Sequence, residues 1–286
     1  MVTAADYQGM DTTWCPGCGN FAILNALKQV LAALDLHPHQ VVLYSGIGQA
    51  AKLPLYMKCN MLNGLHGRTL TYATASQFVD PEMVTIAVGG DGDGFAEGGN
   101  HFLHAIRRNP NMVYLAHNNQ VYGLTKGQAS PTSEHGMVTS TTPEGVYHGR
   151  FNPAAVAVAL DCSWVGRTHT GDMRHMIAMM DEAINHRGFA MLEVMQPCVT
   201  YNKINTLKWY RERSYQLDED GGFDPTDRMA AMTKAFEWGE RFPIGLLYKN
   251  EKRPVMMDNV GVLADGPLNR REAAVNDVSG LLESFR

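Results

Sequence analysis

The sequence predicts an α/β fold in which a mostly parallel β-sheet is covered by helices on both faces. The first observation is that short apolar runs end at turn-forming residues, as 84–88 does before Gly89 and Gly90. The second is that segments with apolar residues at three- and four-residue spacing separate these runs. Strands that are apolar throughout and alternate with helices are typical of parallel sheets buried on both sides.

The elements of the first half of the chain follow from these two patterns. A helix is expected over 20–34, with Asn20 as its N-cap, because apolar residues recur there with helical spacing. The remaining elements are a strand at 41–44, a strand at 84–88, a helical face around 102–106 and a strand at 112–116.

The second half continues the alternation and then loses it. The expected elements are a helix at 154–160, a strand at 163–165, a helix at 173–186 and a strand at 190–194. From about Tyr201 the pattern loosens, and glycines and prolines become frequent. We therefore expect a main domain over 1–200 and an irregular C-terminal extension over 201–286 that packs on the core or on a partner.

Composition excludes several classes of protein. The chain has 286 residues, of which 45% are apolar, and carries a net charge of −5. A mildly acidic balance without basic clusters argues against nucleic acid or an anionic membrane as a partner. No run approaches 18 consecutive apolar residues, and the first residues do not form a secretory signal. We expect a soluble, cytoplasmic protein.

A glycine-rich acidic loop, 89–94, directly follows one predicted strand. Glycines at a strand end let backbone N–H groups approach a phosphate, but Asp91 and Asp93 would repel it. A bridging Mg²⁺ removes the conflict, since it prefers oxygen ligands. Asn118 and Asn119, at the end of the next strand, are positioned to add a neutral oxygen.

Three other interpretations of this loop differ in how well the residues fit them. A solvated turn remains open on local grounds. A calcium-binding EF-hand loop is excluded, because the positions that need Gly and Glu hold Ala96 and Phe102. A nicotinamide-binding turn is disfavoured, because Asp91 and Asp93 would repel an unbridged pyrophosphate.

The combination of Gly90-Asp91-Gly92 with Asn118-Asn119 resembles the thiamine diphosphate motif. The resemblance implies that Asp91, Asn119 and the Val121 carbonyl bind Mg²⁺ and that neighbouring residues contact the diphosphate. The implied cofactor-binding set is Gly46, Ile47, Gly48, Gly90, Asp91, Gly92, Asp93, Asn119, Val121, Gly123, Leu124 and Thr125.

Five cysteines are too few for a secreted disulfide framework, and an odd number cannot all form pairs. Cys15 and Cys18 form a Cys-Pro-Gly-Cys turn, and Cys59 and Cys198 lie further along the chain. No strand precedes the turn, unlike a thioredoxin-type pair. The count alone does not separate a zinc site from an iron–sulfur cluster.

Seven stretches together are similar to the β subunit of 2-oxoacid:ferredoxin oxidoreductases, over about residues 11–205. They are 13–20, 44–48, 64–68, 90–94, 118–125, 128–133 and 196–198. The resemblance implies a [4Fe–4S] cluster on four cysteines, of which Cys15, Cys18 and Cys198 carry over directly. Many members have Cys directly after Gly-Ile-Gly, where this chain has Gln49. Cys59 is assigned the vacant place as the nearest replacement, and Cys162 is interpreted as a buried small apolar residue.

The resemblance also implies an activity and partners. The reaction is oxidative decarboxylation of a 2-oxoacid with coenzyme A, electrons passing to ferredoxin, and Lys52 and His66 near the substrate. 2-Oxoglutarate is favoured as substrate and pyruvate is the alternative. The carboxylate that protonates the aminopyrimidine ring is expected from an α subunit in an (αβ)₂ assembly. A non-redox thiamine-dependent lyase or synthase and a zinc-stabilised binding module remain the rival interpretations.

Overall fold

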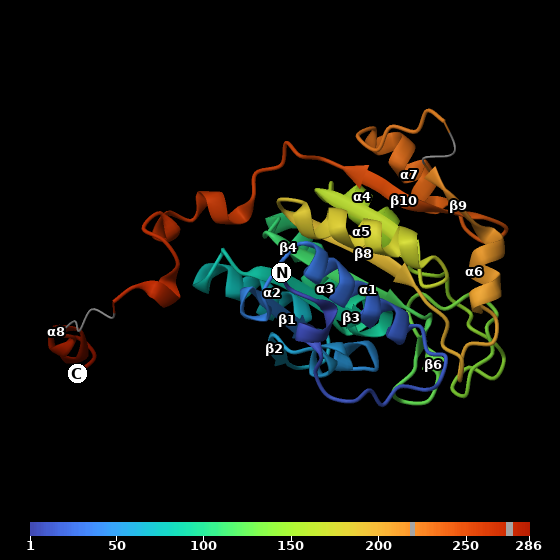
Figure 1. Ribbon diagram of the computed structural model, residues 1–286, viewed down its shortest axis with the longest axis horizontal. Helices are drawn as coiled ribbons and strands as arrows, with labels where there is room; N and C mark the ends of the chain where they lie inside the picture. Colours follow the sequence, from blue (N-terminus) through green and yellow to red (C-terminus); the bar gives the residue numbers. More distant parts are fainter. Residues whose placement is uncertain (218–220, 273–276) are drawn as a thin grey trace.

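The computed structural model describes residues 1–217, 221–272 and 277–286. Its central feature is an eight-stranded sheet in the order β2-β1-β3-β4-β8-β7-β10-β9 (Figure 1). Among its described strands, only β10 pairs with a neighbour, β7, in the antiparallel direction. The predicted mostly parallel sheet is confirmed.

The strands and their bounds explain why the sheet is buried. Strands β4 and β8 are buried along their whole length, as apolar central strands require. The strands of the main sheet are β1 Val41–Ser45, β2 Asn60–Asn63, β3 Val84–Gly90, β4 Met112–Asn118, β7 Trp164–His169, β8 Phe189–Met195, β9 Ser214–Gln216 and β10 Phe242–Lys249. A separate hairpin is formed by β5 Val121–Tyr122 and β6 Gln128–Ala129.

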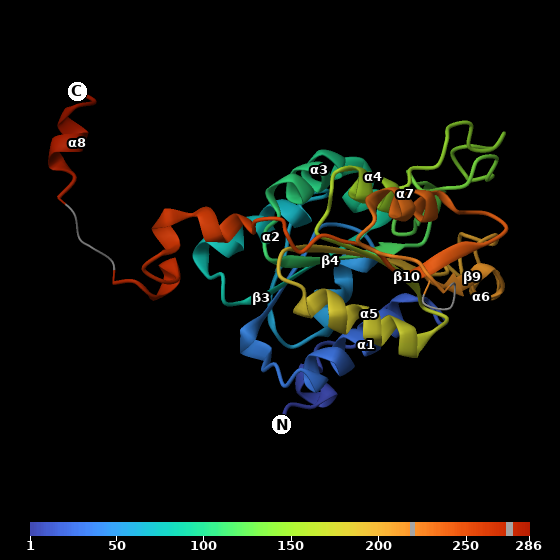
Figure 2. The ribbon, with the colours of Figure 1, turned by 90° about the horizontal axis from the view of Figure 1, so that it is seen from above.

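Helices cover both faces of the sheet, as predicted. Helices α1 (Asn20–Ala33) and α5 (Met173–Asn185) pack on one face, where they share a hydrophobic cluster with β1, β3 and β4. Figure 2 shows the second layer on the opposite face. It consists of α2 Thr69–Val79, α3 Gly99–Arg108, α4 Pro153–Ala159 and α7 Arg228–Phe236, which pack on a second cluster.

Short helical segments connect the main elements. One of them, η3 (Ala50–Tyr56), follows the turn after β1, and the π-helix η4 (Asp93–Glu97) follows β3. The others are η1 Ala4–Tyr7, η2 Pro38–Gln40, η6 Met256–Asn259, η7 Gly261–Leu263 and η8 Leu268–Arg270, with α6 Leu207–Arg213 and α8 Ser279–Glu283 as the remaining α-helices.

One expectation about the helices needs correction, and elements β2 and α2 were not predicted. The N-cap of α1 is Gly19, and Asn20 is the first residue of the helix. The side-chain oxygen of Asn20 is hydrogen-bonded to His117 instead of capping the helix. Strand β2 was not predicted, because its four residues are exposed and form no apolar run. Helix α2 was also missed, since threonine and serine interrupt its apolar face.

The segment after Tyr201 contains more regular structure than its loose pattern indicated. Helices α6 and α7 and strands β9 and β10 lie between residues 207 and 249, and β10 pairs with β7 inside the main sheet. Pro243 and Gly245, the latter with φ of 119°, interrupt β10 and concealed its strand pattern. From residue 250 onward, short helical turns lead away from the sheet toward α8 (Figure 1).

Within the described residues, no helix combines the length and the apolar character that crossing a lipid bilayer requires.

Candidate active site

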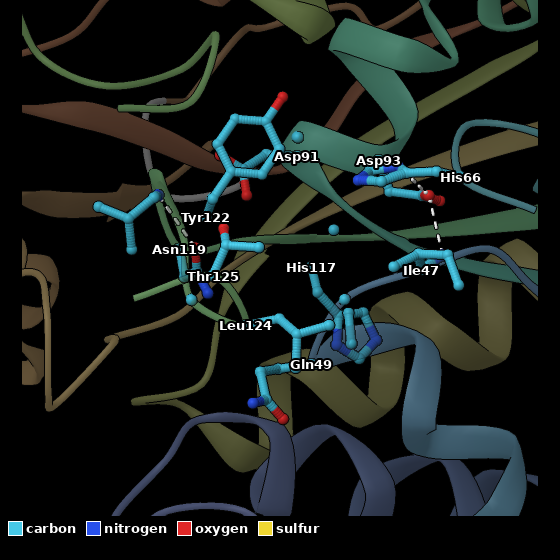
Figure 3. A pocket seen from close by; sticks show the side chains of 16 residues that line it. Ile47, Gln49, His66, Asp91, Asp93, His117, Asn119, Tyr122, Leu124 and Thr125 are labelled. Carbon is cyan, nitrogen blue, oxygen red and sulfur yellow. Dashed lines mark hydrogen bonds and ion pairs between the residues drawn. The ribbon is translucent and has the colours of Figure 1, made fainter. Parts of the chain in front are cut away.

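Loops from three neighbouring parallel strands meet at one edge of the sheet. Strands β1, β3 and β4 lie side by side and run in the same direction, so their carboxyl ends coincide. Such an edge is where ligands bind in open α/β sheets. A cavity of about 80 Å³ lies there (Figure 3), lined by Ile47, Gly48, Gln49, Ala50, His66, Gly90, Asp91, Gly92, Asp93, His117, Asn119, Val121, Tyr122, Gly123, Leu124 and Thr125.

The structure brings together nearly all of the predicted cofactor-binding residues. Every member of that set except Gly46 lines the cavity, although the residues come from three separate stretches of the chain. His66 also lines it. Lys52 does not, because it lies further along on η3.

Asp91 is the most deeply buried charged group of the cavity. Only 1% of its surface is exposed, and its Oδ2 accepts hydrogen bonds from Ser130 Oγ at 2.5 Å and Thr132 Oγ1 at 2.6 Å. Burial raises the pKa of this carboxyl, although both hydroxyl groups oppose the effect. No Lys or Arg of residues 1–217, 221–272 or 277–286 forms an ion pair with it. A bound cation would therefore satisfy a charge that the described residues leave uncompensated.

The two asparagines at the end of β4 have different surroundings. Asn118 points into the sheet, where its Nδ2 donates to Glu193 Oε1 at 2.8 Å. Asn119 lines the cavity, and its Oδ1 accepts from the backbone N–H of Val121 at 3.0 Å. Gln120, which follows them, has φ of 62°, so the chain turns sharply at this point. One amide is directed away from the cavity and the other into it.

Asp93 holds the loops of the site together. Its carboxylate accepts hydrogen bonds from the backbone N–H groups of Ile47 at 3.0 Å and Gly67 at 2.8 Å, and His66 Nδ1 lies 2.9 Å away. A Cβ atom on Gly46 would collide with this carboxylate. The glycine at position 46 therefore makes room for Asp93 rather than for a ligand.

Two other glycines leave space in the cavity itself. Gly48 has φ of 117°, and a Cβ placed there would meet no atom within 4 Å. A Cβ on Gly90 would have its nearest neighbour at 3.9 Å. A ligand can therefore approach the backbone at both positions, which is the function of glycines in phosphate-binding turns.

His117 is a cavity residue that the sequence analysis did not identify. Its ring is fully buried, and its Nδ1 lies 2.9 Å from Asn20 Oδ1, which accepts a hydrogen bond. This contact assigns the proton to Nδ1 and leaves Nε2, which has no partner within the part of the chain that the structure describes, as an acceptor. Burial lowers the pKa of His117 to about 3, so the ring is neutral. A histidine at the end of an otherwise apolar strand was the available signal.

A second, smaller cavity of about 40 Å³ adjoins the first, and three cysteines line it. Cys15, Cys18 and Cys198 come from the N-terminal turn and from the loop after β8. Gln49, Asn119 and Gly123 line both cavities. Thr200 Oγ1 donates to Cys15 Sγ at 3.3 Å and so joins the two cysteine-bearing loops.

Cys59 lies elsewhere, which corrects its assignment as a cluster ligand. It directly precedes β2, and Asn60 is paired with Val42 at the start of β1. The cysteine cavity lies beyond Ser45, the other end of that strand, and each strand residue advances roughly 3.3 Å. Cys59 is therefore separated from Gln49 by roughly the length of β1.

The donor set does not fit a cluster held by four thiolates. In the part of the chain that the structure describes, no three His, Cys, Asp or Glu side chains are grouped so that they could hold a single metal ion. Cys162 is fully buried among apolar residues of the second cluster, as predicted, and contributes nothing to the cavity.

Known proteins match this chain over most of its length. Residues 40–194 match the family described as thiamine pyrophosphate enzyme, C-terminal TPP binding domain, and residues 198–265 match the C-terminal family of the pyruvate ferredoxin oxidoreductase beta subunit. The 2-oxoacid:ferredoxin oxidoreductase subunit beta of Saccharolobus solfataricus is 44% identical over 83% of this chain and 82% of its own length. The chain belongs to the 2-oxoacid:ferredoxin oxidoreductase beta-subunit family.

Two further similar proteins have names that refer to 2-oxoglutarate. The 2-oxoglutarate oxidoreductase subunit KorB of Mycobacterium tuberculosis is 40% identical over 67% of this chain and 52% of its own length. A solved 2-oxoglutarate:ferredoxin oxidoreductase from Magnetococcus marinus, with 2-oxoglutarate, coenzyme A and succinyl-CoA bound, has a TM-score of 0.89 at 34% identity. The match covers 100% of this chain and 96% of the solved chain.

Membership of the family establishes the class of protein. The chain is a subunit of an oxidoreductase, which implies a partner subunit. The zinc-stabilised binding module and the non-redox lyase or synthase do not agree with this membership.

Proposed function

We propose that the main cavity binds thiamine diphosphate through Mg²⁺, which Asp91, Asn119 and the Val121 carbonyl would hold. The observation that carries the proposal is the buried Asp91 carboxylate, which lacks a cationic partner among the described residues and shares its cavity with Asn119. Mg²⁺ favours oxygen ligands of this kind. When bound, the cofactor supplies the nucleophilic carbon that allows a 2-oxoacid to lose CO₂.

The protein residues around the cavity would orient the cofactor. Gly48 and Gly90 leave the backbone open to the diphosphate. Asp93 fixes the 46–48 and 66–67 loops through its hydrogen bonds, so these loops need not reorganise when the ligand binds. His117 Nε2 offers a neutral acceptor at the cavity wall, which suits a donor group of the ligand and not a phosphate.

The site requires a second subunit. Asp91 and Asp93 are the only carboxylates that line the cavity within the described residues, and both already have partners. Neither is available to exchange a proton with the aminopyrimidine ring. We therefore propose that an α subunit supplies that carboxylate in an (αβ)₂ enzyme, and that this chain alone is inactive.

For the overall reaction we propose CoA-dependent, reversible oxidative decarboxylation of 2-oxoglutarate to succinyl-CoA and CO₂, with ferredoxin as the electron acceptor. The KorB name of one relative and the ligands bound in the Magnetococcus enzyme support this choice over pyruvate. Lys52, next to the cavity loop, would offset the charge of the acid, and His66 would assist at the cavity wall.

The test is an anaerobic assay of the purified α–β complex with CoA and oxidised ferredoxin. We expect kcat/KM to be at least tenfold higher for 2-oxoglutarate than for pyruvate, and no activity from this chain alone. A preference for pyruvate would overturn the substrate assignment, and decarboxylation by the isolated chain would overturn the need for a partner.

A further inference from the structure

Gln49 lines the cysteine cavity beside three thiols. Three thiols, those of Cys15, Cys18 and Cys198, line this cavity, and Cys59 lies roughly a strand length away. Gln49 lines the same cavity. Figure 3 shows its amide on the side of the main cavity away from Asp91. The side chain thus extends from the cofactor cavity toward the cysteines.

Contacts around Gln49 fix this position. Its backbone carbonyl accepts a hydrogen bond from Trp14 Nε1 at 2.8 Å, which ties it to the residue before Cys15. A Cβ placed on Gly123 would lie 3.8 Å from Gln49 Cγ and 4.0 Å from Cys198 Sγ. Both side chains, together with Asn119 Nδ2 at 3.8 Å, therefore lie around the same point beside the bare backbone of Gly123.

Two buried polar atoms at this cavity have no hydrogen-bond partner among the described residues. They are Gln49 Oε1, an acceptor, and Asn20 Nδ2, a donor on a side chain that is 1% exposed. Buried polar atoms are normally paired, because leaving one unpaired costs roughly 1–3 kcal/mol. A metal ion would satisfy the oxygen, and an inorganic sulfide would accept from the nitrogen.

We propose that the cavity binds an iron–sulfur cluster through three thiolates and the Gln49 side-chain oxygen. Thiolates are the soft ligands that iron–sulfur clusters require, whereas a neutral amide oxygen binds iron more weakly. One corner of the cluster is therefore labile. The inference concerns this chain's ligands and does not depend on which 2-oxoacid is the substrate.

The labile corner has a defined chemical consequence. One-electron oxidation by ferricyanide converts [4Fe–4S]²⁺ into [3Fe–4S]⁺ and free Fe²⁺, and the electron reduces ferricyanide to ferrocyanide. The bond that breaks is the one between the Gln49 oxygen and iron, together with that iron's bonds to sulfide. A fourth thiolate would bind that iron more strongly than an amide oxygen, so we expect less iron to be released by the same mild treatment.

The experiment uses the α–β complex, purified anaerobically and reconstituted with iron and sulfide. Wild type, Gln49→Cys, Gln49→Leu, Cys15→Ser and Cys59→Ser are treated with one equivalent of ferricyanide. Released iron is measured with a chelator, and the oxidised three-iron cluster by electron paramagnetic resonance. Binding of magnesium thiamine diphosphate to the same preparations reports whether the cofactor site, and with it the proposed function, is intact.

We expect wild type and Cys59→Ser to release one iron per cluster and give the three-iron signal alike. Gln49→Cys should retain its iron, Gln49→Leu should lose iron even before oxidant is added, and Cys15→Ser should hold no stable cluster. The proposal is overturned if Cys59→Ser loses the cluster, if wild type resists oxidation as Gln49→Cys does, or if wild type binds no iron while still binding magnesium thiamine diphosphate.

Discussion

Replacing Glu193 with glutamine is expected to destabilise the fold by about 3–5 kcal/mol, the usual cost of breaking a buried ion pair. Glu193 is fully buried on β8, and its Oε2 accepts from Arg167 Nε at 2.8 Å. Arg150 Nη2 lies 3.9 Å from Oε1, and Asn118 Nδ2 donates to the same oxygen. Glu193 thus connects the fully buried Arg167 and the mostly covered Arg150 to the strand that positions the asparagine pair.

The magnitude follows from these distances. At an effective dielectric constant of about 20, unit charges 2.8 Å apart attract by roughly 6 kcal/mol and charges 3.9 Å apart by roughly 4 kcal/mol. Glutamine removes both attractions but keeps one acceptor oxygen, and Arg150 keeps its contact with the Trp238 ring, 3.6 Å away. The net cost is therefore well below the sum of the two attractions.

The assay is urea unfolding followed by tryptophan fluorescence, with linear extrapolation to zero urea. Glu212→Gln is the matched control, because Glu212 is 53% exposed and lies 3.6 Å from the exposed Lys208. Loss of the exposed Glu212–Lys208 ion pair should lower the free energy of unfolding by less than about 0.5 kcal/mol. Equal unfolding free energies for the Glu193 and Glu212 variants would refute the reasoning.

The pH dependence provides a second check on Glu193. Burial alone raises the pKa of this carboxyl, but Arg167 and Arg150 outweigh that effect, and its pKa lies below the ordinary value of 4.5. A lowered folded-state pKa stabilises the fold above the unfolded-state pKa, and this contribution is lost as pH falls through the folded-state value. The difference in the free energy of unfolding between wild type and Glu193→Gln should be largest at pH 7 and should become smaller below pH 4.5. A gap that stays constant on acidification would contradict the ion pair.

Three further substitutions test other parts of the account. Gly46→Ala should cost about 1–3 kcal/mol in urea unfolding, because its Cβ would displace the Asp93 carboxylate, and a variant as stable as wild type would contradict that role. Asn109→Ala should cost about 1–3 kcal/mol in the same assay, because Oδ1 accepts from the buried N–H of Phe189 at 2.8 Å; an unchanged midpoint would refute this. Lys52→Ala should raise KM for 2-oxoglutarate about tenfold with kcat nearly unchanged, and steady-state kinetics showing unchanged KM would exclude a binding role.

Local sequence pattern predicted the sheet and the loops that meet at its edge. The runs that became β3 and β4 were apolar and ended at the acidic glycine loop and the asparagine pair. Because parallel strands end at the same edge, the meeting of Asp91 and Asn119 followed from their order along the chain.

Features that depend on pairing between distant segments could not be predicted in this way. The position of Cys59 is set by the register of β2 against β1, and this register cannot be predicted from the spacing of the cysteines. The role of Asp93 depends on backbone N–H groups of Ile47 and Gly67, which any residue except proline would supply. His117 stood out only as a polar residue at a strand end, and its contact with Asn20 crosses most of the first half of the chain.

The central claim is that Asp91 and Asn119 hold magnesium diphosphate at the edge of the sheet. Isothermal titration of thiamine diphosphate into the α–β complex, with and without Mg²⁺, tests it most directly. The account predicts Mg²⁺-dependent binding that weakens at least tenfold, about 1.4 kcal/mol, in Asp91→Asn and is unchanged in the exposed control Asp224→Asn. Equal affinity of wild type and Asp91→Asn, or binding that ignores Mg²⁺, would contradict it.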